Sequence, residues 1–239
     1  MLSHDDRART SPFSRIGGFA GIGFALLIVT ANAVMVPAGL PVPGSGAEEA
    51  AAFFRGQTTA VGIGSALVPA AWVLATLFGA AVVAALRRAE RTSGEAWSLL
   101  GFAGVVLQNA AFAAVVATRL ALTREDAEAA ALWALHDALF ALNGAFLALA
   151  LSGLSIGGVR AGLVRPWHAA VGLLSATLLL SSATLALPVV AGVEGVGLLG
   201  LAGWALWVVW TIAYGAALIR CRPSDLPVDT VGRRSRSAP

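Results

Sequence analysis

Six long apolar stretches alternate with short polar connections along the chain. They cover residues 16–36, 61–86, 97–118, 131–158, 167–187 and 196–219. A helix of about 20 residues is needed to cross a ~30 Å hydrocarbon core, and each stretch is about that long or longer. The pattern predicts an all-α polytopic membrane protein, a bundle of six transmembrane helices over residues 16–220. Polar tails flank it at 1–15 and 221–239, and the Arg-, Ser- and Pro-rich C-terminal tail is predicted to be disordered.

The composition agrees with a membrane protein and argues against a soluble one. Hydrophobic residues make up 58% of the chain and charged residues 12%, whereas soluble domains average about 25% charged residues. The mean hydropathy is +0.80 and the isoelectric point is near 10.4. A basic chain of this kind could bind nucleic acid, but the arginines lie at the ends of apolar stretches and in the tails. We therefore expect the lipid bilayer, and no nucleic acid, as the partner of this surface.

The first apolar stretch has two interpretations, a retained span or a cleaved signal peptide. Ala31-Asn32-Ala33 has the A-x-A form of a cleavage site, and the preceding segment is basic. The apolar run is, however, longer than the 7–15 residues usual for a signal peptide. We expect a retained span. Gly17, Gly21 and Ala25 follow one another at four-residue spacing, a face that lets another helix approach closely and makes a homo-oligomer conceivable.

The first connection predicts a short surface helix over residues 46–55. Ser45 and Glu48 fit the S-x-x-E spacing of a capping box at its start. Phe53 and Phe54 are then expected to lie against the bilayer.

Three other helix boundaries follow from charges, caps and prolines. Arg87 and Arg88 are expected to end the second span and begin a charged loop that continues to Glu95. Thr123, followed by acidic residues, is expected to be the N-cap of the fourth helix. Pro188 is expected to stop the fifth.

The arginines divide unevenly between the two faces that six spans define. An even number of spans puts both tails on one face, and that face holds 13 of the 16 arginines, whereas the other holds Arg55, Arg119 and Arg124. Short loops rich in arginine stay in the cytoplasm. The chain is therefore predicted to lie in a bacterial plasma (inner) membrane with both termini cytoplasmic.

Ionisable groups enter a long apolar segment at one place, His136 and Asp137 in the fourth span. A buried carboxylate costs several kcal/mol unless it is paired, and an arginine is its best partner. Packing of the third span against the fourth would bring Arg119 close to Asp137. The amides expected to meet deeper in the membrane, and so to complete a candidate polar site, are those of Gln108, Asn109 and Asn143.

Three interpretations of this polar site remain open. The pair can form a proton or cation site in a cavity open to the outside. It can instead fix the helix register through an Asp137–Arg119 ion pair, with amides bonding across one interface. Finally, residues 138–159 are themselves 22 uncharged residues, so that the pair can lie at the membrane interface.

A second candidate is an aromatic face on the sixth span, formed by Trp204, Trp207 and Tyr214. It can line a pocket for a hydrophobic or cationic ligand, or it can pack as core against small residues of other spans. Bulky core packing is the favoured interpretation.

Enzymatic motifs are absent from the sequence. There is no H-E-x-x-H, no G-x-S-x-G and no phosphate-binding glycine loop. All basic residues are arginine, which excludes lysine-centred catalysis, and Cys221 is the single cysteine. We expect no metal, no cofactor and no catalytic residue.

Several segments carry a family resemblance: P-x-P followed by AEEAAAFF at 41–54, LWALHDALFALNG at 132–144, RPW at 165–167, and W-x-x-W with a closing arginine at 207–220. In these the chain resembles uncharacterised six-span integral membrane proteins of high-GC bacteria, described as domains of unknown function. The resemblance implies no substrate and no catalytic residue. The expected function is a non-enzymatic structural or regulatory component, or a partner subunit of another membrane protein; the alternative is a small proton- or cation-coupled transporter that uses the polar site.

Overall fold

The computed structural model describes residues 12–124 and 128–220, and every regular element in them is a helix. Six helices are long and apolar enough to cross a membrane, which confirms the predicted number of spans. These are α1 (Pro12–Met35), α3 (Thr58–Ser93), α4 (Trp97–Leu122), α5 (Ala129–Arg160), α6 (Pro166–Thr184) and α8 (Gly197–Arg220). Two short helices, α2 (Ala47–Gly56) and α7 (Ala186–Val190), lie in the connections.

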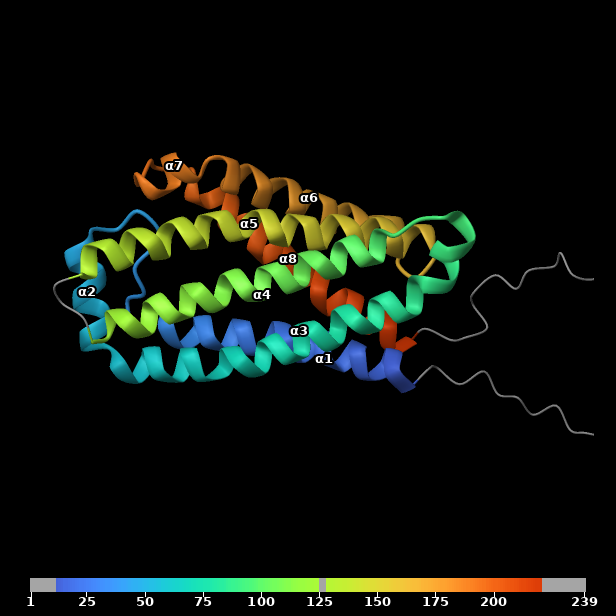
Figure 1. The fold of residues 1–239 in the computed structure, drawn as a ribbon, viewed down its shortest axis with the longest axis horizontal. Helices are drawn as coiled ribbons and strands as arrows, with labels where there is room; N and C mark the ends of the chain where they lie inside the picture. Colours follow the sequence, from blue (N-terminus) through green and yellow to red (C-terminus); the bar gives the residue numbers. More distant parts are fainter. Residues whose placement is uncertain (1–11, 125–127, 221–239) are drawn as a thin grey trace, which may run out of the picture.

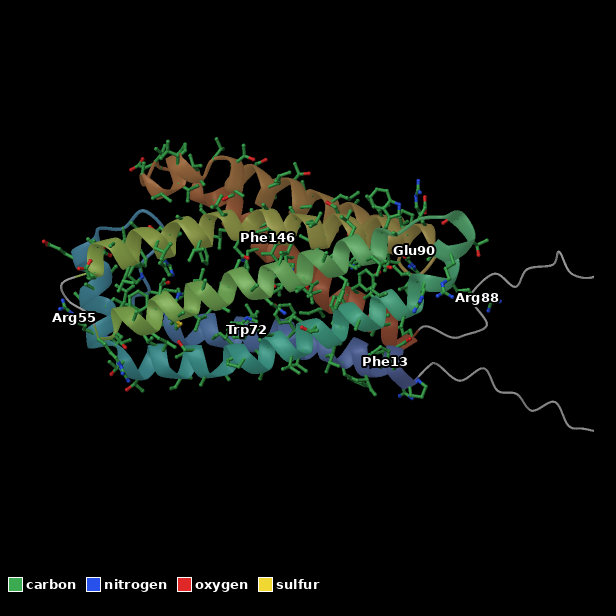
Figure 2. The ribbon with its side chains drawn as sticks, in the orientation of Figure 1. Phe13, Arg55, Trp72, Arg88, Glu90 and Phe146 are labelled. Carbon is green, nitrogen blue, oxygen red and sulfur yellow. The ribbon has the colours of Figure 1, made fainter. Side chains whose placement is uncertain are left out.

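The six long helices form a closed ring in chain order. Each packs against the next, from α1 to α3, α4, α5, α6 and α8, and α8 packs back against α1 (Figure 1). α1 begins and α8 ends at one end of the bundle, here called the terminal end; α2 and α7 lie at the other, here called the loop end. Phe13, Arg88 and Glu90 mark the terminal end and Arg55 the loop end (Figure 2).

The centre of the ring is a packed apolar core. Phe24 from α1, Phe78 from α3, Leu151 and Leu154 from α5, and Tyr214 from α8 are all buried there. Burial of large aromatic and aliphatic side chains at native density leaves little free space between helices.

The small-residue face of α1 lies inside this bundle. Side chains added at Gly17 and Gly21 would meet Ala81 and Phe78 of α3, and one at Gly18 would lie 2.6 Å from the Gly215 carbonyl of α8. The close approach that these residues permit is therefore made within the chain.

Helices α4 and α5 pack closely, and small residues face one another across their contact. A Cβ added at Gly104 would lie 2.8 Å from Ala150 Cα, and one at Gly153 would lie 2.7 Å from Gly101 Cα. Small residues at both positions let the two backbones touch, as is common between membrane helices. This contact fixes the register that places Arg119 opposite the polar pair on α5.

The prediction that the second span ends at Arg87 and Arg88 and gives way to a loop was wrong. α3 continues through Arg87 and Arg88 to Ser93, and Gly94, with φ +72°, caps it in the left-handed conformation. Arginine and glutamate are good helix formers, so charge ends the apolar stretch without ending the helix.

Two other predicted boundaries were also wrong. Thr123 ends α4 rather than capping α5, and its hydroxyl donates to the Leu120 carbonyl; residues 125–127 lie outside the described part. α6 ends at Thr184, before Pro188, which falls in the short helix α7. Near a helix start a proline loses no intrahelical bond, and so it is tolerated there.

The predicted surface helix exists as α2, but its environment differs. Phe53 and Phe54 are buried in the protein, with Phe54 packed against Trp133. Gly46 is the N-cap, and no side-chain hydrogen bond caps the helix in the described structure, so the proposed capping box is not formed. The predicted tails at 1–15 and 221–239 lie outside the described residues, except for Pro12 to Arg15, which belong to α1.

Candidate functional site

The loop end of α4 and α5 brings Arg119, His136 and Asp137 together. The Arg119 Nε group donates a hydrogen bond to His136 Nε2 at 3.0 Å. His136 Nδ1 lies 3.2 Å from Asp137 Oδ1. The expected direct ion pair between Arg119 and Asp137 is not formed in the described part of the chain. The imidazole bridges the two charges instead.

The direction of the hydrogen bonds that join Arg119, His136 and Asp137 defines which nitrogen of the His136 ring carries the proton. An arginine nitrogen can only donate, so His136 Nε2 must accept with its lone pair. The ring proton is then on Nδ1, from which it is donated to the Asp137 carboxylate. The arrangement is a neutral imidazole between a cation and an anion, and its total charge is zero.

The other oxygen of Asp137 holds a loop. The backbone N–H of Gly44 donates to Asp137 Oδ2 at 2.8 Å, and Trp133 Nε1 donates to the Ser45 carbonyl at 2.8 Å. The loop formed by residues 37–46, here called the strap, is thus tied to α5 at two successive residues. Asp137 is 2% exposed, because the strap covers it.

Aromatic rings enclose the imidazole. Trp133 stacks on His136 with 4.6 Å between ring centroids and 12° between planes. The Phe140 ring is also nearly parallel to the imidazole, with 6.0 Å between their centroids. The Phe54 ring lies 6.4 Å from the imidazole. Apolar walls keep water from the hydrogen bonds and strengthen them electrostatically.

The three amides predicted to join the site are placed elsewhere. Gln108 faces the centre of the bundle. Asn109 donates to the Trp72 carbonyl and to the Thr76 hydroxyl of α3, both at 3.3 Å. Asn143 is buried, and its Oδ1 atom has no hydrogen-bond partner in the described structure.

The predicted aromatic face is mostly core. Tyr214 is fully buried and Trp207 nearly so, whereas Trp204 is half-buried. Trp207 packs edge-on against Phe24 at 5.3 Å, and Tyr214 against Phe78 at 5.6 Å. The hydroxyl of Tyr214 is used inside the bundle.

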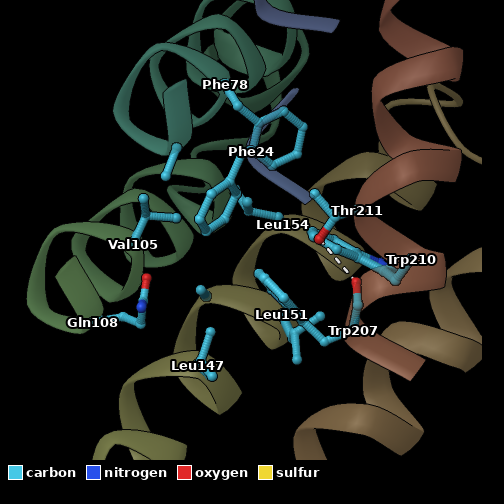
Figure 3. Close-up of a pocket in the computed structure, with 12 residues that line it drawn as sticks. Phe24, Phe78, Val105, Gln108, Leu147, Leu151, Leu154, Trp207, Trp210 and Thr211 are labelled. Carbon is cyan, nitrogen blue, oxygen red and sulfur yellow. Dashed lines mark hydrogen bonds between the residues drawn. The ribbon is translucent and has the colours of Figure 1, made fainter. Parts of the chain in front are cut away.

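A small cavity remains beside this core (Figure 3). Its volume is about 20 Å³, room for about one water molecule. Gln108 and Thr211 supply its polar groups, and Figure 3 shows Phe24, Leu151 and Trp207 among its apolar walls. A cavity of this size cannot hold an organic ligand, for which pockets are typically at least about 300 Å³.

Hydrogen bonds tie α8 to its neighbours around Trp210. Its indole N–H donates to the Ser155 hydroxyl at 3.0 Å, and its carbonyl accepts from His168 Nε2 at 2.9 Å. The Tyr214 hydroxyl donates to the Leu154 carbonyl at 3.1 Å. His168 therefore carries its proton on Nε2, opposite to His136, and its buried Nδ1 has no partner among the described residues.

At the terminal end, Glu90 is a buried carboxylate that sequence analysis missed. It accepts hydrogen bonds from the Ser98 backbone N–H at 2.6 Å and from the Ser98 hydroxyl. It thereby caps the first turn of α4 from the end of α3, where a negative group is favourable. Beside it Arg160 forms an ion pair with Glu95.

Gly44 is the other residue that sequence reasoning missed. The available signal was the P-V-P-G-S-G run of the strap, which predicts a turn but names no partner.

No group of three or more histidine, cysteine or acidic side chains in the described residues could hold a metal ion. Comparisons of the chain with family models, with curated proteins and with solved structures find no match.

Proposed function

We propose that the protein is a non-enzymatic component of a bacterial plasma membrane, either a structural or regulatory component or a partner subunit of another membrane protein. The observation that carries this proposal is the closure of the polar chain. Arg119, His136 and Asp137 bond to one another, and the remaining Asp137 oxygen is bonded to the strap. These three polar side chains therefore form hydrogen bonds within the fold, and these bonds stabilise it.

The geometry of His136 also argues against acid–base catalysis. In a catalytic triad the imidazole nitrogen opposite the carboxylate faces a nucleophile whose proton it takes. Here that nitrogen is Nε2, and it accepts from Arg119, a group that has no proton to give at ordinary pH. Any such reaction would first require the arginine to leave.

The distribution of arginines supports cytoplasmic termini. Among the described residues, the terminal end carries Arg15, Arg87, Arg88, Arg91, Arg160, Arg165 and Arg220, whereas the loop end carries Arg55, Arg119 and Arg124. Short arginine-rich connections remain in the cytoplasm. On this proposal the strap and α2 face the outside.

Thiol labelling from the outer side tests the proposal. In a Cys221→Ser background, Val42→Cys reports an exposed strap position, since Val42 is 67% exposed. Asn143→Cys reports the buried position below the polar chain. A membrane-impermeant maleimide added to intact cells should label the first cysteine and leave the second unmodified. Labelling of position 143 at a similar rate would contradict a closed site, and an unlabelled position 42 would contradict the orientation.

The partner-subunit role has its own test. Extracts in a mild detergent should contain the protein in a complex larger than one chain, as measured by native electrophoresis. A monomer as the sole species would count against that role without affecting the closed site.

A small proton- or cation-coupled transporter is the second candidate. It is favoured by one observation: the Asn143 Oδ1 atom is buried without a donor, on the same helix as the titratable pair. Purified protein in liposomes should show no proton or sodium flux above protein-free liposomes if the first proposal holds. Flux that Asp137→Asn abolishes would establish the second.

A further inference from the structure

The strap is held between two parts of the loop end. On one side it is tied to α5 through the Gly44 N–H and the Ser45 carbonyl. On the other side Gly44 touches the turn after α7: a Cβ at Gly44 would lie 2.7 Å from Gly192 Cα and 2.9 Å from the Val189 carbonyl. With φ +89°, Gly44 also adopts a conformation that other residues avoid. Movement of the strap would therefore break the contact between the connection that follows α1 and the connection between α6 and α8.

The hydrogen bond from Arg119 can form only while His136 is neutral. A protonated imidazole carries N–H groups on both nitrogens and has no lone pair left to accept. A second proton would therefore place the Nε2–H of His136 against the Nε–H of Arg119, whose nitrogen lies 3.0 Å from His136 Nε2. Attraction would become repulsion between two cations at close range.

The imidazolium would also change its interaction with Asp137. Its Nδ1–H already faces Oδ1, and the new positive charge would draw the carboxylate toward the ring. The same carboxylate accepts from Gly44, and Trp133, which stacks on the ring, holds Ser45. Both strap contacts therefore depend on groups that touch His136.

We propose that Arg119, His136 and Asp137 form a proton-operated latch for the strap. With a neutral ring, the chain of hydrogen bonds keeps the strap closed over α5. With a second proton on His136, Arg119 leaves its position, the carboxylate turns toward the imidazolium and the strap is released. The device responds to acidity on the side of the membrane that the loop end faces.

The charged groups around the latch are separated into two sets. Arg119 and Asp137 contact the ring, and the strap has no ionisable side chain. The other described ionisable residues of the loop end have exposed side chains: Glu48, Glu49 and Arg55 on α2, Arg124 and Glu128 between α4 and α5, and Glu194 after α7. Each of these exposed groups can be replaced singly, so a transition that depends on His136 can be distinguished by substitution from one that depends on them.

Strap mobility measured by spin labelling tests the latch. A nitroxide on Val42→Cys in the Cys221→Ser background reports the strap, and one on Thr59→Cys, exposed at the start of α3, is the matched control. Spectra are recorded in nanodiscs from about pH 8 to about pH 4.5, which covers the usual histidine range and extends below it. Both faces meet the same buffer, so the result does not depend on membrane orientation. The strap label should lose its immobile component on acidification, whereas the control label should not change.

Two substitutions assign the transition to the ring. His136→Gln offers an acceptor to Arg119 and a donor to Asp137 but cannot gain a proton, so its strap should stay immobile at both extremes. His168→Gln, which removes the other buried histidine, should keep the wild-type transition. The proposal is overturned if the wild-type strap is equally mobile throughout the pH range, or if His136→Gln retains the transition. If His136→Gln fails to fold, the pH dependence of strap mobility in the wild-type protein is the test of the proposal.

Discussion

Removal of the Asp137 carboxylate should destabilise the protein strongly. Asp137→Ala leaves the Arg119 guanidinium half-buried without an anion and deprives Gly44 of its acceptor. An uncompensated buried charge costs about 3–5 kcal/mol, and a hydrogen bond to a charged group contributes about 1.5–3 kcal/mol. The two losses share the same carboxylate and are not additive. We expect a total loss of about 3–5 kcal/mol in the free energy of unfolding.

Reversible unfolding in mixed detergent micelles provides the assay. Glu194→Ala is the matched control, since it removes an exposed carboxylate at the same end and should change stability by no more than about 0.5 kcal/mol. The double variant Arg119→Met with Asp137→Ala should be more stable than Asp137→Ala alone, because it removes both charges together. Equal stability of Asp137→Ala and Glu194→Ala would refute the reasoning. The reasoning would also be refuted if the double variant lost as much stability as Arg119→Met alone and Asp137→Ala alone together.

Three further predictions concern the rest of the bundle. Gly104→Ala should be less stable than Gly62→Ala by about 1–3 kcal/mol, because the first overpacks the α4–α5 contact while the second meets nothing within 4 Å; equal unfolding midpoints would contradict that contact. Tyr214→Phe should lose about 0.5–1.5 kcal/mol with the hydrogen bond to Leu154, measured in the same assay, and an unchanged stability would mean that the bond contributes nothing. Glu90→Ala should cost about 1–3 kcal/mol by leaving the first turn of α4 uncapped, and faster amide exchange confined to that turn is the expected signature, with unaltered exchange as the contrary result.

The spans could be predicted because membrane thickness fixes their length and hydropathy. The helix ends could not be predicted from the same signal. Arg87 and Arg88 mark where the apolar stretch stops, but they are good helix formers, and α3 continues to Ser93. Phe53 and Phe54 show the same limit: an apolar helix face has one pattern, whether lipid or protein covers it.

The polar chain was predictable in part. The cost of burying Asp137 called for a cation, and antiparallel packing of neighbouring helices pointed to Arg119. The intervening position of His136 depends on side-chain rotamers, which the sequence pattern does not specify. The Gly44 contact was beyond reach, since its donor is a backbone N–H 93 residues away from Asp137, and every non-proline residue carries that group.

The amides were misplaced for a related reason. Gln108, Asn109 and Asn143 were predicted to lie at similar depth, but depth does not determine the direction in which a side chain points. Helix rotation sends Gln108 to the central cavity and Asn109 toward α3. A difference of one residue along a helix is a rotation of about 100° and changes the neighbouring helix.

The protonation state of the His136 ring tests the central claim most directly. Nitrogen NMR of the protein labelled with ¹⁵N-histidine distinguishes the two neutral tautomers from the charged ring, and His168→Gln assigns the signals of the two buried histidines. At neutral pH we predict that His136 carries its proton on Nδ1, with Nε2 accepting from Arg119, whereas His168 carries its proton on Nε2. A His136 ring protonated on Nε2 at neutral pH would contradict the bridge between Arg119 and Asp137, and with it the closed polar site.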